Sequence, residues 1–171
     1  MMPDISIIVP AYNEASRLAT SLRAILGYLR NHGTTELIVV DDGSQDGTVE
    51  VALESIRGLS PHRARVIRCA VNRGKGFAVL AGLMAARAPI ALFTDADLST
   101  PVTEIPKITE RIARGECDVT FGSRAVDRSL IGVHQPGDSG SKRHGSARGT
   151  RAEYRVSRDR AGNLARQSAQ R

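Results

Sequence analysis

The first 121 residues alternate between short apolar runs and longer amphipathic stretches. The apolar runs are rich in β-branched residues, which is typical of strands. They are residues 5–9, 37–40, 64–67, 90–93 and 119–121. The second and fourth runs are continuous rather than alternating, a pattern that predicts strands covered on both faces of a sheet.

The stretches between the apolar runs predict helices. The clearest covers residues 14–30, where Leu18, Leu22, Ile25 and Leu29 form one stripe at the helical spacings of three and four. The other predicted helices are residues 48–57, 76–86 and about 103–114. This regular alternation predicts an α/β fold with three layers, α/β/α, in which helices cover a mostly parallel sheet through right-handed crossovers.

The composition changes sharply near Gln135. Beyond it glycine, serine and arginine dominate, and Tyr154, Val156 and Leu164 are the apolar residues besides alanine. Such a segment buries too little apolar surface to offset the entropy of ordering it. We therefore expect a folded domain over residues 1–134 and a basic, low-complexity and disordered tail over residues 135–171.

The net charge of +6 is located in this tail, since residues 1–134 hold equal numbers of acidic and basic residues. We therefore expect no nucleic-acid partner for the domain. Binding of nucleic acid through the tail is an alternative, and it predicts a salt-sensitive affinity that disappears when the tail is deleted.

The remaining composition points to a soluble protein with reduced thiols. Cys69 and Cys117 lie far apart and match neither a disulfide framework nor a zinc-finger spacing. No apolar run approaches the roughly 18 residues of a membrane-spanning helix. The first residues lack the basic start of a signal peptide, so we expect a cytoplasmic protein.

A polar cluster follows each predicted strand. The five clusters are residues 10–14, 41–48, 72–76, 95–99 and 122–124. Because ligands bind beyond the carboxyl ends of parallel strands, where these ends share one edge, the clusters predict a common binding site.

Asp95 and Asp97 form the most informative of these clusters. Two carboxylates one residue apart, directly after a buried strand, favour a hard divalent cation such as Mg²⁺ or Mn²⁺, which prefers oxygen ligands and often shares them with phosphates. The alternative is a helix-capping aspartate with a solvated neighbour. The position after a buried strand favours the metal.

The acidic turn at Asp42 is open to two interpretations. Its carboxylate could bind a ribose hydroxyl or a base N–H, or the turn could use Asp, Gly and Ser for backbone reasons alone. For Asp46 and Thr48 we favour a role as helix caps.

The cluster at residues 72–76 has the features of a phosphate cradle. Its glycines expose backbone N–H groups before a helix start, and Arg73 and Lys75 add positive charge. It matches neither the Walker A pattern nor G-x-G-x-x-G, which disfavours a dinucleotide site. Arg124 is a candidate anion clamp, or else a solvated surface arginine.

Taken in order, these segments resemble the family 2 glycosyltransferases of the GT-A fold, most closely the polyprenyl- or dolichyl-phosphate mannose and glucose synthases. The resemblance covers residues 4 to about 136. The matching segments are Ile7 to Glu14, Val40 to Ser44, Asn72 to Gly76, Asp95 to Ser99 and Gly122 to Arg124.

The resemblance implies a role for each position. Pro10, Tyr12 and Glu14 would line the nucleotide pocket, Asp42 would contact base or ribose, Lys75 would lie near the nucleotide or phosphate, Asp95 and Asp97 would hold Mg²⁺ or Mn²⁺ with Asp97 as the more direct ligand, and Arg124 would lie near the sugar or acceptor phosphate. Asp97 and Arg124 would be the catalytic residues.

The resemblance also implies the reaction. A hexose would pass from a nucleotide-diphosphate sugar, of the UDP-glucose or GDP-mannose class, to a polyprenyl phosphate, with inversion at the anomeric carbon. A lipid phosphate is already ionised at neutral pH, so it needs no strong general base. An acceptor of this kind would place the protein at the inner face of a membrane.

The chain departs from this family after Pro136. We interpret residues 137–171 as an out-of-frame or otherwise aberrant ending, which would leave the donor half of the site without the acceptor half. A nucleotide-sugar-binding remnant without transfer is therefore one alternative. A sugar nucleotidyltransferase is another, although such an enzyme has a glycine-rich segment where this chain has residues 10–14.

Overall fold

The computed structural model describes residues 2–120. The elements are β1 (Ile5–Ala11), α1 (Ala15–Asn31), β2 (Thr35–Asp41), α2 (Thr48–Ser55), β3 (Ala64–Arg68), α3 (Lys75–Ala85), β4 (Ile90–Phe93), the 3₁₀ helix η1 (Val102–Glu104) and α4 (Ile105–Ala113). The predicted tail and Arg124 lie outside the described residues, as does the boundary at residue 134.

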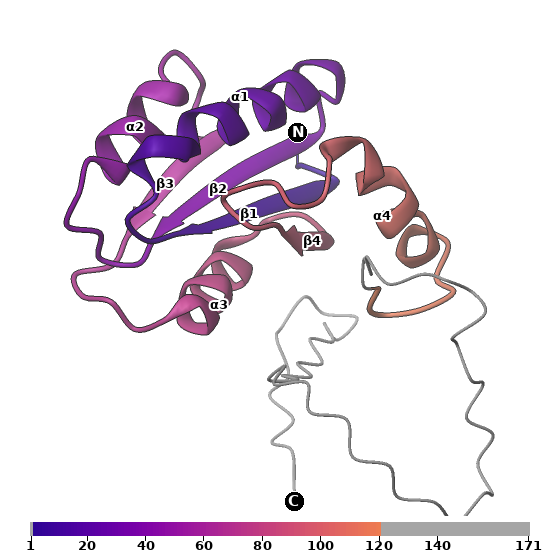
Figure 1. Ribbon diagram of the computed structural model, residues 1–171. Helices are drawn as coiled ribbons and strands as arrows, with labels where there is room; N and C mark the ends of the chain where they lie inside the picture. Colours follow the sequence, from indigo (N-terminus) through magenta and orange to yellow (C-terminus); the bar gives the residue numbers. More distant parts are fainter. Residues whose placement is uncertain (1, 121–171) are drawn as a thin grey trace, which may run out of the picture.

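The four strands form one parallel sheet in the order β3-β2-β1-β4. In Figure 1, α1 and α2 lie on one face of this sheet and α3 lies on the other. This arrangement confirms the predicted three-layer α/β/α fold. Since all strands are parallel, the loops that follow them meet at one edge, as the sequence predicts.

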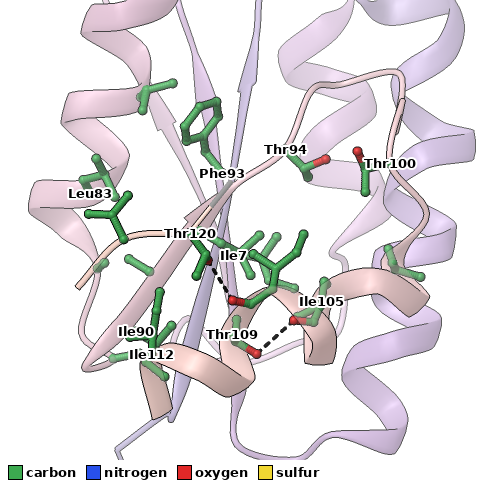
Figure 2. Close-up of a pocket in the computed structure, with 18 of the residues that line it drawn as sticks. Ile7, Leu83, Ile90, Phe93, Thr94, Thr100, Ile105, Thr109, Ile112 and Thr120 are labelled. Carbon is green, nitrogen blue, oxygen red and sulfur yellow. Dashed lines mark hydrogen bonds between the residues drawn. The ribbon is translucent and has the colours of Figure 1, made fainter. Parts of the chain in front are cut away.

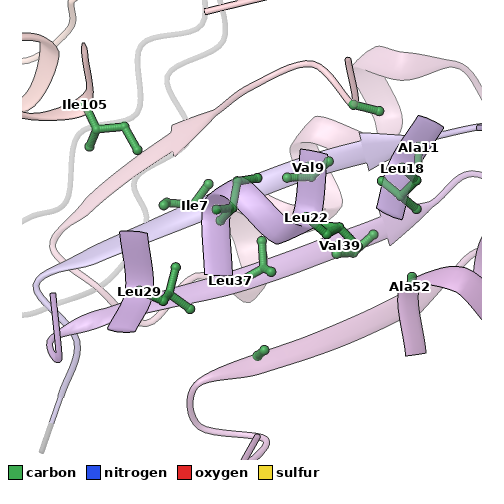
Figure 3. Close-up of a cluster of buried hydrophobic side chains, with 13 residues drawn as sticks. Ile7, Val9, Ala11, Leu18, Leu22, Leu29, Leu37, Val39, Ala52 and Ile105 are labelled. Carbon is green, nitrogen blue, oxygen red and sulfur yellow. The ribbon is translucent and has the colours of Figure 1, made fainter. Parts of the chain in front are cut away.

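The two central strands bury both of their faces. Ile7 and Val9 pack with Leu37 and Val39 beneath the apolar stripe of α1, including Leu22 (Figure 3). The intervening residues, among them Ile8, Ile38 and Val40, pack against Ala78 of α3 on the other face. Each fully buried aliphatic side chain contributes about 1.5–3 kcal/mol, so this double core fixes the register of β1 on β2.

Helix α3 lies unusually close to β1 at Gly82. A Cβ atom at this position would lie 2.3 Å from Cγ2 of Ile8 and 3.2 Å from Cγ2 of Val40. Only glycine permits this approach, which sets the depth of α3 against the sheet and hence the position of its first residue, Lys75.

Strand β4 differs from its prediction. It pairs with β1 alone, its residues are only partly buried, and Phe93 is 52% exposed. No strand among residues 2–120 pairs with its outer edge. The expectation that β4 is covered on both faces is therefore wrong for the described chain, because an apolar run does not distinguish an edge strand from a central one.

The predicted strand at residues 119–121 is also not seen in its described part. Val119 and Thr120 are not in a strand; instead, the Thr120 hydroxyl donates a hydrogen bond to the Ile108 carbonyl, 2.7 Å away. Strand formation needs a partner ladder, which the described residues do not supply here.

An apolar hollow of about 910 Å³ lies along β4, between α3 and α4 (Figure 2).

A buried ion-pair cluster closes the amino edge of the sheet. Glu36 on β2 is fully buried and accepts hydrogen bonds from the Ser6 hydroxyl at 2.6 Å, Arg65 Nη1 at 2.7 Å and Arg87 Nη2 at 2.7 Å. Burial alone raises the pKa of Glu36, but the hydrogen bonds from Ser6, Arg87 and Arg65 lower it from 4.5 to about 2. This carboxylate therefore joins β1, β2 and β3 to the segment between α3 and β4 around one charge.

No helix in residues 2–120 combines the length and the apolar character needed to cross a bilayer. The cysteines at positions 69 and 117 are both free thiols.

Candidate functional site

A pocket of about 520 Å³ lies at the carboxyl edge of the sheet, formed by the loops that follow the four strands. The residues that line it are Pro10, Ala11, Tyr12, Glu14, Asp42, Asn72, Gly74, Lys75, Asp95, Ala96 and Asp97. They include seven of the eight site residues predicted from the sequence. The eighth, Arg124, lies outside the described residues.

The loop after β1 is tied to the loop after β2 by reciprocal hydrogen bonds at Asn13. Its backbone N–H donates to Ser44 Oγ at 2.9 Å, and its Oδ1 accepts from the Gln45 N–H at 2.9 Å. Asn13 has a φ of 53°, a left-handed conformation that asparagine tolerates better than most residues. This turn places Tyr12 and Glu14 at the pocket wall.

Asp46 and Thr48 extend this connection. Asp46 accepts hydrogen bonds from the N–H groups of Thr48 at 2.9 Å and Ala15 at 3.2 Å, and Thr48 Oγ1 accepts from the Glu14 N–H at 2.8 Å. The hydrogen bond from the Thr48 hydroxyl is the main cause that lowers the pKa of Asp46. The expectation that Asp46 and Thr48 cap a helix is therefore wrong, because the N-cap of α2 is Gly47 and no side chain caps it. Instead, the two residues connect the start of α1 to the start of α2.

Asp42 holds the loop between β3 and α3 through hydrogen bonds to its backbone. Its side chain is buried and accepts hydrogen bonds from the N–H groups of Arg73 at 3.0 Å and Gly74 at 2.7 Å. The adjacent Gly43 has a φ of +74°, and a Cβ there would lie 2.6 Å from the Asn72 nitrogen. The acidic turn therefore holds the β3–α3 loop, a role that neither interpretation from the sequence included.

Lys75 reaches across the pocket from the first turn of α3. Its Nζ lies 2.5 Å from Oδ1 of Asp95, and both side chains are about half exposed. Arg73, which the sequence places in the same cradle, instead lies over the ring of Phe77 with its guanidinium carbon 4.5 Å from the ring centre. Among the described residues that line the pocket, Lys75 is therefore the one with a basic side chain.

Asp97 is held by a turn that follows β4. Its Oδ1 accepts hydrogen bonds from the N–H of Ser99 at 3.0 Å and from the Ser99 hydroxyl at 2.7 Å. Leu98 between them has a φ of 49°. At the start of α1, the Arg17 guanidinium pairs with Glu14 three positions before it. Hydrogen bonding and charge from Glu14, with a smaller effect from Asp97, raise the pKa of Arg17.

The donor set fits a hard divalent cation that shares its ligands with a substrate. Four carboxylates and one ammonium line the pocket, and the ammonium of Lys75 already occupies one oxygen of Asp95. Within residues 2–120 no group of three or more potential ligands is arranged for a metal. Asp95 and Asp97 would supply two oxygens and leave positions for phosphate and water, as Mg²⁺ and Mn²⁺ sites often do.

The described histidines lie away from this pocket. His32 stacks on Tyr28 at the end of α1, and His62 contacts Arg87 near the buried cluster around Glu36. Asn13 and Ser44 are the supporting residues that the sequence analysis missed, because a bond across 31 positions leaves no local pattern.

Comparison with known proteins shows the family to which this chain belongs. The family model "Glycosyl transferase family 2" matches residues 6–164. This range passes the predicted boundary at residue 134, which remains a prediction. The dolichyl-phosphate beta-glucosyltransferase of Drosophila melanogaster is 42% identical over 133 residues, covering 71% of this chain and 41% of that protein. The chain spans less than half the length of the curated relatives it matches.

Two solved structures share the fold at moderate identity. A mannosyltransferase from Pyrobaculum calidifontis in complex with GDP-Man and Mn²⁺ is 31% identical, with a TM-score of 0.50 over 57% of this chain and 28% of that chain. Glucosyl-3-phosphoglycerate synthase from Mycobacterium tuberculosis, in complex with Mn²⁺, UDP and glucosyl-3-phosphoglycerate, is 30% identical, with a TM-score of 0.52 over 64% of this chain and 39% of that chain. By its sequence, its strand-end pocket and its fold, the chain belongs to glycosyl transferase family 2.

Proposed function

We propose that the protein is a metal-dependent, inverting hexosyltransferase that uses a nucleotide-diphosphate sugar and transfers its sugar to a polyprenyl phosphate. The observation that carries this proposal is the pocket itself: seven residues from four separate loops, predicted from strand-end motifs, line one cavity. Similar proteins support the donor and acceptor classes: two were solved with Mn²⁺ and GDP-Man or UDP, and another is a dolichyl-phosphate beta-glucosyltransferase.

The charges of the pocket explain why a cation is needed. Four acidic residues line the same space, namely Glu14, Asp42, Asp95 and Asp97. Arg17 pairs with Glu14 and Lys75 pairs with Asp95, so two negative charges remain to repel a diphosphate that enters without a cation. A divalent cation held by Asp95 and Asp97 would neutralise the diphosphate and make it a better leaving group. Lys75 would add a further positive charge on the phosphate side.

The other pocket residues orient the donor. Pro10, Tyr12 and Glu14 form the wall on the β1 side, and the turn around Asn13 holds them in place. Asp42 keeps the β3–α3 loop in position and would contribute its remaining acceptor capacity to the ribose or base. These groups act by positioning, since none of them needs to move a proton.

The acceptor removes the need for a general base. A lipid phosphate is ionised at neutral pH and can attack the anomeric carbon directly, in an oxocarbenium-like transition state comparable to that of glycoside hydrolysis. Arg124 would hold the acceptor phosphate or the transferred sugar. An acceptor with an isoprenoid chain would bring the protein to a membrane surface as a peripheral protein.

A second candidate is nucleotide-sugar binding without transfer. It is favoured by one observation: the described residues that line the pocket include only site residues assigned to the donor or its cation. The sugar nucleotidyltransferase alternative is disfavoured, because the chain belongs to a transferase family of a different type.

Thermal-shift screening separates these functions. We expect UDP-, GDP- or dTDP-sugars to raise the melting temperature of the protein only with Mn²⁺ present, because ligand binding stabilises the folded state by mass action. Asp97→Asn should abolish the shift, and Asp4→Asn, an exposed aspartate outside the pocket, should keep it. A sugar nucleotide that binds equally well without any cation contradicts the proposal.

The acceptor is tested by adding polyprenyl phosphate to the sugar nucleotide that binds. Appearance of a polyprenyl-phosphate sugar, detected by mass spectrometry, supports the transferase. Cation-dependent binding with no product supports the second candidate instead.

A further inference from the structure

The ion pair between Lys75 and Asp95 is the feature of the pocket that the proposed function leaves unexplained. The lysine Nζ lies 2.5 Å from a carboxylate oxygen that the proposed function gives to a divalent cation. An ammonium and a metal ion cannot both occupy that oxygen, so one must leave when the other binds.

The backbone at Lys75 is held in place, whereas the side chain is largely exposed. Asp42 holds the preceding residue, Gly74, by a hydrogen bond of 2.7 Å, and Gly82 sets the depth of the same helix against β1. The Lys75 side chain is 59% exposed, so its four-carbon stem is free to swing from a constant base. Lysine suits this movement because its ammonium is a compact charge on a flexible stem.

The surrounding charges make the ammonium useful in both positions. Next to Asp95 it neutralises one of four carboxylates that line the pocket. Released from Asp95, it faces the same cavity, where a diphosphate would lie next to the cation. The positive charge is therefore retained in the pocket and changes its partner.

We propose that Lys75 is a displaceable counter-ion: it occupies Asp95 until a divalent cation binds, and it then pairs with the diphosphate of the donor. The displacement of Lys75 from Asp95 rests on the geometry of the ion pair. Its later pairing with the diphosphate rests on the proposed function. It makes diphosphate binding by Lys75 conditional on the cation, which disfavours binding of the nucleotide without the metal.

Replacement of Lys75 should then change two affinities in opposite directions. Lys75→Met removes the competitor at Asp95, so we expect Mn²⁺ alone to bind about fivefold more tightly, the range of a partly exposed ion pair. The same variant lacks a charged phosphate partner, so UDP or GDP in saturating Mn²⁺ should bind about tenfold more weakly. A residue with a merely structural role would not strengthen either affinity.

The experiment is titration calorimetry of the full chain with Mn²⁺ alone, and then with UDP and GDP in saturating Mn²⁺. Lys75→Arg keeps the charge and should keep the Mn²⁺ affinity close to that of the unmodified protein. Lys107→Met is the matched control, because Lys107 in the first turn of α4 forms an ion pair with Glu104 of η1, 2.9 Å away, outside the pocket lining. Circular dichroism melting verifies that each variant is folded.

Each outcome is informative. Tighter Mn²⁺ binding and weaker nucleotide binding by Lys75→Met, with Lys107→Met unchanged, supports the inference. Unchanged or weaker Mn²⁺ binding by Lys75→Met overturns it, even if the nucleotide still binds. Mn²⁺ binding that tightens in Lys75→Met, with no nucleotide bound by any variant, overturns the proposed function and the second half of the inference but supports the first half. No Mn²⁺ binding by any variant overturns both.

Discussion

Replacing Glu36 with glutamine tests the buried cluster at the amino edge of the sheet. The change keeps the size of the side chain but removes the charge that faces Arg65 and Arg87. Both guanidinium groups would then lack their shared counter-ion in a site where Glu36 itself is fully buried. Breaking a buried pair in this way is strongly destabilising.

The magnitude follows from the pKa of Glu36, which falls from 4.5 to about 2 on folding. Each tenfold change in proton affinity corresponds to about 1.4 kcal/mol, so the ionised carboxylate contributes about 3 kcal/mol to folding at neutral pH. A lowered pKa means that this contribution is present above pH 4.5 and is lost as the pH falls toward 2. About 1 kcal/mol should remain at pH 3.

Urea unfolding, followed by circular dichroism, measures this difference. Glu36→Gln should lower the free energy of unfolding by about 3 kcal/mol at pH 7 and by about 1 kcal/mol at pH 3. The control is Glu54→Gln, which breaks an exposed pair with Arg57 and should change stability by less than about 0.5 kcal/mol. A Glu36 variant as stable as the unmodified protein at pH 7, or a difference that does not shrink in acid, would refute the reasoning.

Two more substitutions test the pocket and the core. Asp42→Ala removes the acceptor of two backbone N–H groups and should raise the nucleotide dissociation constant in Mn²⁺ at least tenfold, which is about 1.4 kcal/mol; calorimetry showing an unchanged constant would contradict the supporting role of Asp42. Gly82→Ala places a methyl group 2.3 Å from Ile8 Cγ2 and should lower the free energy of unfolding by about 1–3 kcal/mol; a neutral effect in urea unfolding would show that α3 shifts without cost.

The helices and the central strands could be predicted because their patterns are local. The stripe on α1 matches the 3.6-residue period, and the observed helix begins and ends one residue later than predicted. Strand β1 extends two residues past the end of its apolar run, and β2 begins two residues before its run and ends one residue after it. Pairing in register, as between Pro10 and Val40, extends a strand past the residues whose composition favours it.

The position of each strand in the sheet could not be predicted in the same way. The apolar run of β4 resembles that of β2, yet β2 is fully buried and β4 is partly exposed. Burial of an edge strand depends on what lies beside it, and the four residues of β4 carry no information about that neighbour.

The position of polar residues after parallel strands predicted that the site residues lie at one edge of the sheet. It did not predict the hydrogen bonds between their loops. The prediction required only that parallel strands point the same way, which is why seven residues meet in one pocket. The support of the β3–α3 loop by Asp42, and the exchange between Asn13 and the loop after β2, depend on distances set by the packed helices. Those distances exist only once the core has formed.

The described residues that line the pocket fall between positions 10 and 97, which has a consequence for synthesis on the ribosome. The segments that form the pocket are translated first, and among residues 2–120 the strands that carry them pair with one another in a single ladder. These residues can therefore come together while later segments are still being made. Under the proposed function, later segments could change the choice of acceptor while the donor pocket stays the same.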